Sequence, residues 1–338
     1  MLVMSANLEV GGKKTTIDNS LNVVFAEITE PYTAGSPQED IIWTNLRPKQ
    51  IQKELEKRGY KISYYIAQQL LDAHGFRKRS FIKDIPLGQS THRDEQFKYI
   101  AKLKERFLDA GNPVLSIDTK KKELIGCFHR KGHYYDQKFR KVNDHDFLSF
   151  AKAKMVPHGI YDIGQNKGYL TMGCSSDTSS FVVDNIIDHW QKDIQWDYLD
   201  KEWMLLLCDG GGSNNCRHYI FKQHLCRLAR TLEMNILVAH YPPYCSKWNP
   251  IEHRLFSQVH KSWEGSILDS IDTAKKLAET TTTKTGLSVK VKINKNKYKT
   301  GLKVKNEFKD NLQKFVTFSN ILPQWNYSIE YQNAQLII

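Results

Sequence analysis

The stretch EWMLLLCDGGGSN, residues 202–214, decides the fold class of this 338-residue chain. An unbroken apolar run, WMLLLC, precedes Asp209, and three glycines follow it. A short apolar run that ends in turn residues indicates a strand buried on both faces. Such strands occur in sheets with helices on both sides, so this run predicts a mixed α/β domain with Asp209 at the tip of an inner strand.

The segments around this strand predict the order of the remaining elements. PVLSIDTKKKELIGCF (113–128) predicts two strands around a lysine-rich turn, and HGIYDIGQNKGYLTMGCS (158–175) predicts another pair. A helix with an apolar face precedes the inner strand, and a second helix follows it. The strand NILVAHYPP (235–243) and a helix that starts at Pro250 complete the unit. The order β-β-β-α-β-α-β-α is that of a ribonuclease H-like mixed sheet with flanking helices.

Two acidic residues end strands in this arrangement. Asp118 ends PVLSID as Asp209 ends WMLLLCD. The first and fourth strands of a ribonuclease H-like sheet are neighbours, so we expect these two carboxylates to lie side by side. Each aspartate taken alone is also a common turn residue.

Glu252 stands near the start of the last helix, in the stretch NPIEHRLF (249–256). Its spacing to Leu255 and Phe256 places the carboxylate on the apolar face of that helix. One interpretation is a capping box, in which Glu252 reaches back to the amide of Asn249. The other is a third carboxylate beside Asp118 and Asp209.

Three adjacent carboxylates repel one another unless a divalent cation lies among them. Oxygen ligands suit Mg²⁺ or Mn²⁺, and two ions roughly 3.5–4 Å apart can assist phosphodiester chemistry. We therefore predict that Asp118, Asp209 and Glu252 are catalytic residues and metal ligands, with two ions bound. Weaker candidates are three further aspartates and two histidines, the latter as supporting or DNA-contacting groups: Asp144, Asp146, Asp162, His240 and His253.

A segment before this domain, residues 43–80, predicts two short helices joined by a tight turn at Gly59. This pattern indicates a helix-turn-helix, although it also occurs in structural hairpins that bind no DNA. As a DNA-binding element, its second helix would present three side chains to a major groove, followed by a basic tail. The expected DNA contacts are Tyr64, Tyr65 and Gln68 in the helix and Arg77, Lys78 and Arg79 in the tail.

The chain carries a net charge of +12, with 49 Lys and Arg against 37 Asp and Glu. Residues 281–310 hold nine of the lysines against Glu307 and Asp310. Such a concentration favours a polyanionic partner, and a solvated lysine-rich surface is the alternative. Alternation at period two predicts an edge hairpin with a basic outer face. Its expected DNA contacts are Lys290, Lys292, Lys295 and Lys297.

These patterns divide the chain into five parts. We expect a weakly patterned segment (1–42), the helix-turn-helix region (43–92), a connector helix (93–112), the catalytic domain (113–265) and a basic extension (266–338). The six cysteines contain no C-x-x-C pair, which favours free thiols in a reducing compartment. No apolar run is long enough to span a bilayer, and no signal peptide is recognisable. We expect a cytoplasmic, nucleoid-associated protein.

Several motifs together resemble the ISAzo13-type bacterial insertion-sequence transposases. They are SIDTKKKELIG, VNDHDF, GIYDIGQNKGY, DGGGSN, HYPPYCSKWNPIEHRLFS, TTTKTGL and WNYSI. The resemblance implies a DDE transposase in which Asp118, Asp209 and Glu252 form the metal-binding triad. The proline and N-P-I-E run is also similar to that of Tc1/mariner and IS630 transposases. Residues 1–15 depart from the longer front part of the family, which favours a shortened copy.

The expected function is cleavage of element-end DNA and strand transfer by in-line attack. The partners would be double-stranded DNA, as element ends and as target, and further copies of the chain; no membrane is expected. Two rivals remain: a ribonuclease H-like nuclease that cleaves without joining, and a catalytically dead DNA-binding protein.

Overall fold

The structure is a computed structural model that describes residues 7–10, 13–16, 19–35, 42–79, 91–133 and 137–336. It divides into two compact units, Met1–Ile85 and Pro86–Ile338, which are described separately. None of the helices in these described ranges has the length and apolar character that crossing a bilayer requires.

The first unit is built around three helices, α1 (Asn19–Thr29), α2 (Pro48–Lys57) and α3 (Tyr64–Ala73). Pro48 occupies the first turn of α2, and the Ser63 hydroxyl accepts a hydrogen bond from the Ile66 amide at the start of α3 (3.3 Å). Apolar side chains of all three helices form one core, so residues before 43 supply its third helix. The unit also contains the turn η1 (Glu30–Tyr32) and two small antiparallel sheets: β1 (Asn7–Val10) with β2 (Lys13–Thr16), and β3 (Thr33–Gly35) with β4 (Ile42–Thr44).

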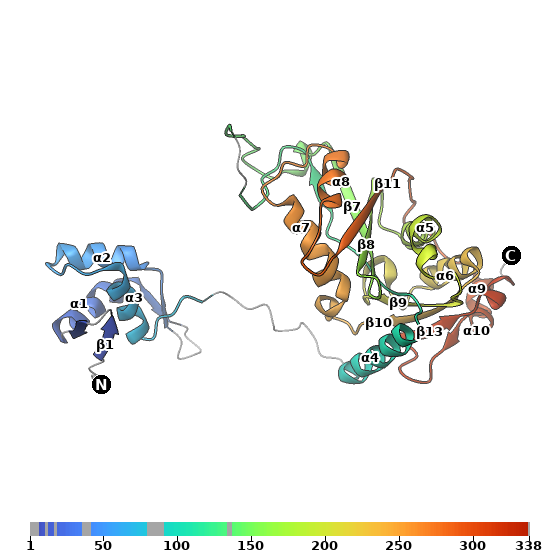
Figure 1. The fold of residues 1–338 in the computed structure, drawn as a ribbon, viewed down its shortest axis with the longest axis horizontal. Coiled ribbons are helices and arrows are strands. Elements are labelled where there is room, and N and C mark those ends of the chain that lie inside the picture. Colours follow the sequence, from blue (N-terminus) through green and yellow to red (C-terminus); the bar gives the residue numbers. More distant parts are fainter. Residues whose placement is uncertain are drawn as a thin grey trace. The chain divides into compact units, whose positions relative to one another are not determined.

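The second unit contains the large mixed sheet (Figure 1). Its neighbouring strands run in the order β11-β8-β7-β5-β9-β10-β13-β12, and β6 pairs with β7. Strand β5 is parallel to β9, β9 is parallel to β10, and β7 is antiparallel to β5. The predicted ribonuclease H-like order is confirmed in the run β8-β7-β5-β9-β10. The strands are β5 (Val114–Thr119), β6 (Glu123–Ile125), β7 (Ala153–Asp162), β8 (Lys167–Gly173), β9 (Trp203–Cys208), β10 (Asn235–His240), β11 (Ser288–Asn294), β12 (Thr317–Phe318) and β13 (Asn326–Ile329).

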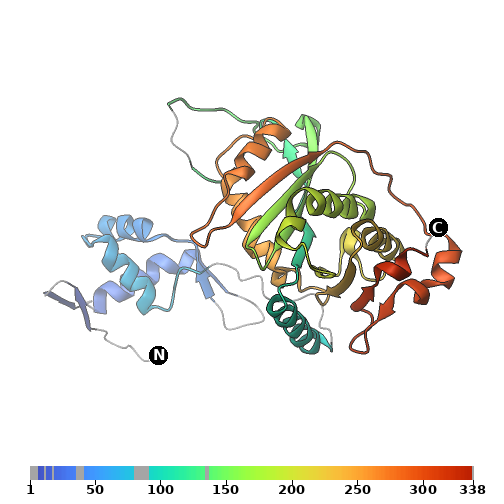
Figure 2. The same cartoon turned by 45° about the vertical axis from the view of Figure 1, so that its right-hand side comes forward.

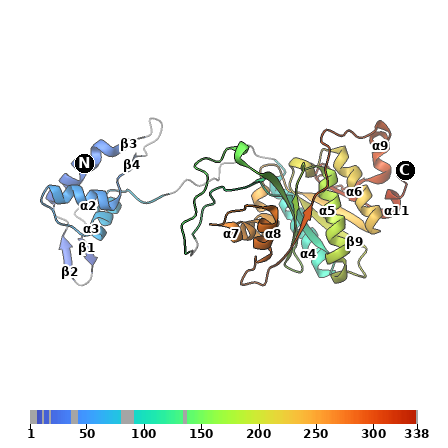
Figure 3. The same ribbon diagram turned by 90° about the horizontal axis from the view of Figure 1, so that it is seen from above.

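Helices cover both faces of this sheet (Figure 3). Helices α5 (Ser179–His189) and α6 (Tyr219–Leu232) bury the apolar side chains of one face. On the other face, α4 (Arg93–Asp109) covers β9 and β10, while α7 (Ser257–Trp263) and α8 (Ile271–Glu279) cover β7, β8 and β11. The short elements are η2 (Leu148–Phe150), η3 (Trp190–Ile194), η4 (Gln195–Asp197), η5 (Gly212–Asn214), η6 (Ser246–Trp248), η7 (Glu252–Phe256), α9 (Asn306–Asp310), α10 (Leu312–Phe315) and α11 (Tyr331–Ala334).

The C-terminal part departs from the expected edge hairpin. Strand β11 pairs alone with β8, in parallel, and the chain then continues without a return strand (Figure 2). The hairpin prediction was wrong because β11 finds its sheet partner in β8. Val289 and Val291, on one side of β11, are buried in the core that α7 and α8 cover. Strand β13 adds to β10 at the other side of the sheet.

Candidate active site

The first two predicted carboxylates lie at the same edge of the sheet. Ile117 of β5 and Cys208 of β9 are paired across the parallel ladder, and Asp118 and Asp209 are the next residues along each strand. Adjacent strands are separated by about 4.8 Å, so the two carboxylates start from neighbouring backbone positions. This register places Asp118 and Asp209 side by side, as expected from the sequence.

Electrostatic contacts link these carboxylates to Glu252. Burial, the charges of Asp209 and Glu252 and a hydrogen bond in which protonated Asp118 donates to Glu252 together raise the pKa of Asp118 to about 8. The Thr119 amide donates to Asp118 Oδ1 (2.6 Å) and acts in the opposite direction. Burial also raises the pKa of Asp209 to about 6, with Asp177 and Glu252 contributing their charge. The group therefore retains a proton at neutral pH unless a cation replaces it.

The segment that carries Glu252 is fastened to the strand that carries Asp118. The Ser116 hydroxyl donates to Asn249 Oδ1 (2.5 Å), and the Asn249 amide group donates to the Ile117 carbonyl (3.3 Å). The Ile251 amide in turn donates to the Ser116 hydroxyl (3.1 Å). Ser116 and Asn249 are fully buried. Because Ser116 lies two residues before Asp118, this contact holds the start of η7 close to Asp118.

The capping-box interpretation of Glu252 is not supported by these contacts. Asn249 uses its side chain to bind β5, and the Glu252 amide donates to the Asn249 carbonyl (3.0 Å). Within the described residues, no hydrogen bond joins the Glu252 carboxylate to the Asn249 amide. The acid begins the π-helical turn η7, a widened turn that often occurs at functional sites.

Glycine at position 159 lets η7 approach the sheet closely. Gly159 is paired with Asp118 across β5 and β7. A Cβ added at Gly159 would lie 2.5 Å from Phe256 Cε1 and 2.9 Å from Ile251 Cδ1. Any side chain there would push η7, and with it Glu252, away from Asp118.

His240 holds the backbone at Asp209. Its ring is fully buried at the end of β10, where Nδ1 lies 3.0 Å from the Asp209 carbonyl oxygen and Nε2 lies 3.1 Å from the Tyr327 hydroxyl. A carbonyl can only accept, so Nδ1 carries the proton and Nε2 accepts from Tyr327. Burial lowers the pKa of His240 to about 4, which keeps this neutral tautomer at physiological pH. His240 therefore supports the site, whereas His253 is exposed on η7.

Sequence reasoning missed a fourth acid, Asp177, in the loop before α5. The Thr119 hydroxyl donates to Asp177 Oδ1 (3.2 Å), and the charge of Asp177 raises the pKa of Asp209. Its position directly before the N-cap Thr178 gives it the appearance of an ordinary helix-start residue. Only the fold brings it to the strand ends.

The other acidic candidates lie elsewhere. Asp162 is paired with Leu115 at the opposite end of the β5–β7 ladder. It is fully buried and accepts hydrogen bonds from the Tyr198 hydroxyl (2.9 Å to each oxygen), so it has a structural role. Asp144 and Asp146 are exposed in the loop that leads to η2.

The expected DNA contacts of the first unit are all on its surface. Tyr64 and Tyr65 are 44% and 70% exposed, and Gln68 is exposed on the same helix. Arg77, Lys78 and Arg79 are exposed in the segment after α3. These side chains are free to meet a partner, and their role in DNA binding stays a prediction.

The four C-terminal lysines separate into two pairs. Lys290 lies 3.1 Å from Asp193, and Lys292 forms ion pairs with Asp193 (2.7 Å) and Asp188 (3.0 Å) on the neighbouring helix. Lys295 and Lys297 are exposed beyond β11 and form no ion pair within the described residues. The first pair neutralises carboxylates, and the second pair remains available to an anion.

The donor set at the strand ends fits a divalent cation by its chemistry. Asp209 Oδ1 is buried and has no hydrogen-bond partner within the described residues, and all the converging ligands are carboxylate oxygens. The carboxylates nevertheless do not form a ready-made cage: no group of three or more His, Cys, Asp or Glu in the described ranges is arranged to hold a metal ion. The acids are within electrostatic reach of one another, and an ion would have to draw them together.

The fold is that of a ribonuclease H-like domain, with acidic side chains at the ends of β5 and β9. A family model described as the Rhodopirellula transposase DDE domain matches residues 25–331, and the chain belongs to this family of DDE transposases. It is therefore a DNA-cleaving and strand-transferring enzyme, which confirms the resemblance seen in the motifs.

Solved structures to which the chain is similar include two complexes of the Mos1 transposase. The Mos1 paired-end complex with the left transposon end has 15% sequence identity and a TM-score of 0.42, covering 80% of this chain and 72% of that chain. The Mos1 mariner paired-end complex with Mn has 14% identity and a TM-score of 0.42, with the same coverage. No curated protein matches the chain.

Proposed function

We propose that this chain is the transposase of a bacterial insertion sequence and that Asp118, Asp209 and Glu252 are its catalytic residues. The observation that carries the proposal is the convergence of the three acids at one edge of the sheet, where Asp118 and Asp209 follow from paired positions of β5 and β9 and the charge of Glu252 raises the pKa of both. Membership of the DDE transposase family supports the same assignment.

The three carboxylates would hold Mg²⁺ or Mn²⁺, as two ions. Such ions supply positive charge that stabilises the attacking and leaving oxygens of a phosphodiester. The residues around them keep the ligands in place: Asn249 and Ser116 fix the approach of Glu252, and His240 fixes the backbone of Asp209. Asp118 would lose its retained proton when a cation binds.

The reaction would proceed in two in-line displacements. Water attacks a phosphorus at the element end, one P–O bond breaks, and the products are a 3′-hydroxyl and a 5′-phosphate. The 3′-hydroxyl then attacks a phosphorus of the target, and the target strand leaves through its own 3′ oxygen. No side chain forms a covalent bond to DNA in this scheme.

Recognition of the element end is assigned to the first unit. Tyr64, Tyr65 and Gln68 on α3 would face base edges, while the basic tail after α3 would contact phosphates. Because two element ends must be joined to one target, we propose a homo-oligomer assembled on double-stranded DNA. This assignment places the protein with the DNA of a bacterial cytoplasm.

The test is a strand-transfer assay that uses an element-end duplex with a pre-cut 3′ end and a supercoiled target plasmid. The end sequence is taken from inverted repeats in the DNA that flanks the coding region. Joined product that requires Mg²⁺ or Mn²⁺ is the expected result. Cleavage without joining would favour a nuclease, and DNA binding without either reaction would favour a catalytically dead DNA-binding protein.

A further inference from the structure

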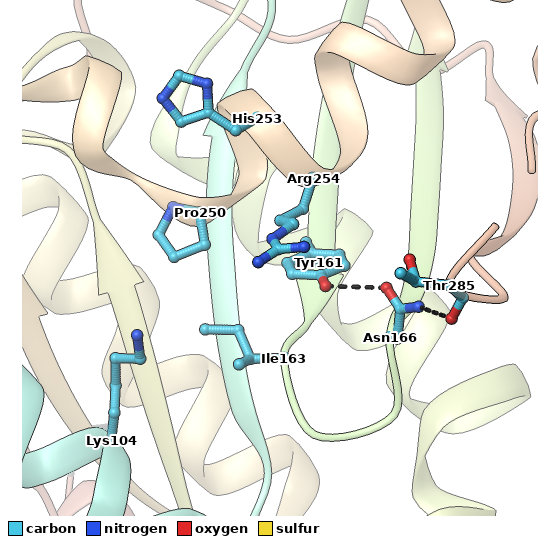
Figure 4. Close-up of a pocket in the computed structure, with 8 residues that line it drawn as sticks. All are labelled: Lys104, Tyr161, Ile163, Asn166, Pro250, His253, Arg254 and Thr285. Atoms are coloured by element: carbon cyan, nitrogen blue, oxygen red, sulfur yellow. Dashed lines mark hydrogen bonds between the residues drawn. The ribbon is translucent and has the colours of Figure 1, made fainter. Parts of the chain in front are cut away.

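A groove runs along one side of the helix that carries Glu252, on the sheet face between α4 and η7. Its first cavity has a volume of about 660 Å³, with Lys104, Tyr161, Ile163, Pro250 and Arg254 among its lining residues (Figure 4). A second cavity of about 450 Å³ is lined by Gln258 and the segment 282–285, and shares four lining residues with the first. The two cavities adjoin at these shared residues and are together called the α4–η7 groove.

The groove is positively charged. Lys104 and Arg254 line the first cavity, Lys284 lines the second, and no Asp or Glu lines either. Within the described ranges, neither the Lys104 nor the Arg254 side chain forms an ion pair or a hydrogen bond. Burial lowers the pKa of Lys104, and the charge of Arg254 lowers it further. Two uncompensated cations are thus held close together, an arrangement that an anion between them would stabilise.

The walls of the groove are already fixed. The Tyr161 hydroxyl donates to Asn166 Oδ1 (2.9 Å), and Asn166 Nδ2 donates to the Thr285 carbonyl (2.8 Å), as the dashed lines of Figure 4 show. Helix α4, which carries Lys104, is anchored near its start by buried Gln96, which donates to the His240 carbonyl (2.8 Å) and to Asn326 Oδ1 (2.8 Å). A preformed wall reduces the ordering cost of binding a ligand.

We propose that the α4–η7 groove binds the phosphodiester backbone of the DNA strand on which Glu252 acts. This inference rests on the proposed function, in which Glu252 is a catalytic residue. Pro250, His253 and Arg254 line the groove, and all three lie within two residues of Glu252 in the chain. Cations line both cavities, Lys104 the first and Lys284 the second, which suits successive phosphates better than a single small anion. Arg254 would bind a phosphate through its guanidinium, Lys104 would add a point charge, and the faces of Tyr161 and Pro250 would meet the sugars.

The test measures DNA binding by the full chain without divalent metal. A fluorescein-labelled duplex oligonucleotide is titrated at several salt concentrations with the wild type and with Lys104→Ala/Arg254→Ala. We expect affinity to fall roughly tenfold and the log–log salt slope to decrease by about 0.9 for each phosphate that the variant no longer binds. The single variant Arg254→Lys keeps the charge and should retain most of the wild-type affinity.

A matched control removes the same charge elsewhere. Lys102→Ala/Lys276→Ala deletes two exposed lysines of α4 and α8 that do not line the groove, and melting temperatures verify that both double variants fold. Equal effects of the two double variants, or none, would overturn the proposal. Binding of an oligoglutamate peptide that depends on Lys104 and Arg254, with unchanged duplex affinity, would also overturn it.

The result is separable from the test of the catalytic proposal. The binding assay contains no metal and requires no cleavage. It can therefore be interpreted even if Asp118, Asp209 and Glu252 are not the catalytic residues. Conversely, metal-dependent cleavage with unaltered DNA affinity in the groove variant contradicts the groove alone.

Discussion

Ser116 and Asn249 are joined by a buried hydrogen bond across 133 positions of the chain, and this bond connects two of the three proposed metal ligands. Ser116 lies two residues before Asp118 on β5, and Asn249 lies three residues before Glu252. The same hydroxyl receives the Ile251 amide. The distance between Asp118 and Glu252 therefore depends on a contact that touches neither carboxylate.

Ser116→Ala should weaken metal-dependent cleavage by loosening this contact. It leaves Asn249 Oδ1 and the Ile251 amide without their partner, at a cost of about 1–3 kcal/mol of stability. If the contact positions Glu252, the Mg²⁺ concentration that gives half-maximal cleavage should rise, and excess Mg²⁺ should restore part of the rate. The core variant Ile186→Val, which costs about 0.5–1.5 kcal/mol, serves as the stability control. An unchanged Mg²⁺ dependence in Ser116→Ala would show that the contact is only structural.

Asp118→Asn should stabilise the metal-free protein. The folded pKa of Asp118, about 8, lies above the ordinary value of 3.8, so the folded state binds more protons than the unfolded state between these limits. Stability is therefore lost as pH rises through that window. Asparagine has no proton to lose, and in EDTA at pH 8 its melting temperature should exceed that of the wild type by roughly 2–4 °C for each kcal/mol of added stability.

Adding Mn²⁺ should reverse the order of these two proteins. The wild type gains stability because a bound cation compensates its carboxylates, while Asp118→Asn lacks one of the ligands. Thermal melting in EDTA and in Mn²⁺ checks both statements. A lower melting temperature for the variant in EDTA, or an equal shift of both proteins in Mn²⁺, would contradict the assignment.

His158→Leu should make the fold less sensitive to acid. His158 is fully buried on β7, and neither ring nitrogen has a hydrogen-bond partner within the described residues. Burial, with a contribution from His189, lowers its pKa to about 3. A lowered folded pKa gives stability that is complete above the unfolded value of 6.5 and is lost as pH falls from there toward 3. Melting temperatures between pH 7 and pH 4.5 should fall less steeply in the variant, with the exposed His145→Gln as control. Parallel pH curves for the wild type and His158→Leu would refute this account.

The two pairs of C-terminal lysines should respond differently to alanine substitution. Lys290→Ala/Lys292→Ala removes the ion-pair partners of Asp193 and should lower the melting temperature with little effect on DNA affinity. Lys295→Ala/Lys297→Ala should leave stability unchanged and reduce the salt slope of DNA binding by about 0.9 for each phosphate that is released. Melting curves and anisotropy titrations of both double variants decide this. A reduction of DNA affinity confined to the first pair would be the opposite of our expectation.

The strand ends could be predicted from the sequence because each signal is local. The apolar runs that end in Asp118 and Asp209 identify inner strands, and the element order then makes those strands neighbours, as the register of Ile117 with Cys208 confirms. The start of α3 could likewise be predicted from one capping residue, Ser63.

The remaining features depend on contacts between distant segments. Asn249 has the character of a helix cap in sequence, and only the fold shows that its side chain binds Ser116 instead. Asp177 joins the acidic group through the placement of α5, and Lys292 meets Asp188 and Asp193 because β11 lies beside β8. Alternating lysines could not distinguish a hairpin from a single parallel strand, since both have a period of two.

The most direct measurement is the rate at which Glu252→Gln nicks an element-end duplex in Mg²⁺ or Mn²⁺. Glutamine keeps the shape and capping ability of the side chain but loses the charge that a cation requires. We expect a folded protein with wild-type DNA affinity whose nicking rate is reduced roughly a thousandfold, equivalent to about 4 kcal/mol of transition-state stabilisation. Asp118→Asn and Asp209→Asn should give similar losses, and combining them should add little because the three act as one unit. Nicking by Glu252→Gln at a rate near that of the wild type would contradict the account, because Glu252 could not then be a ligand of the catalytic metal.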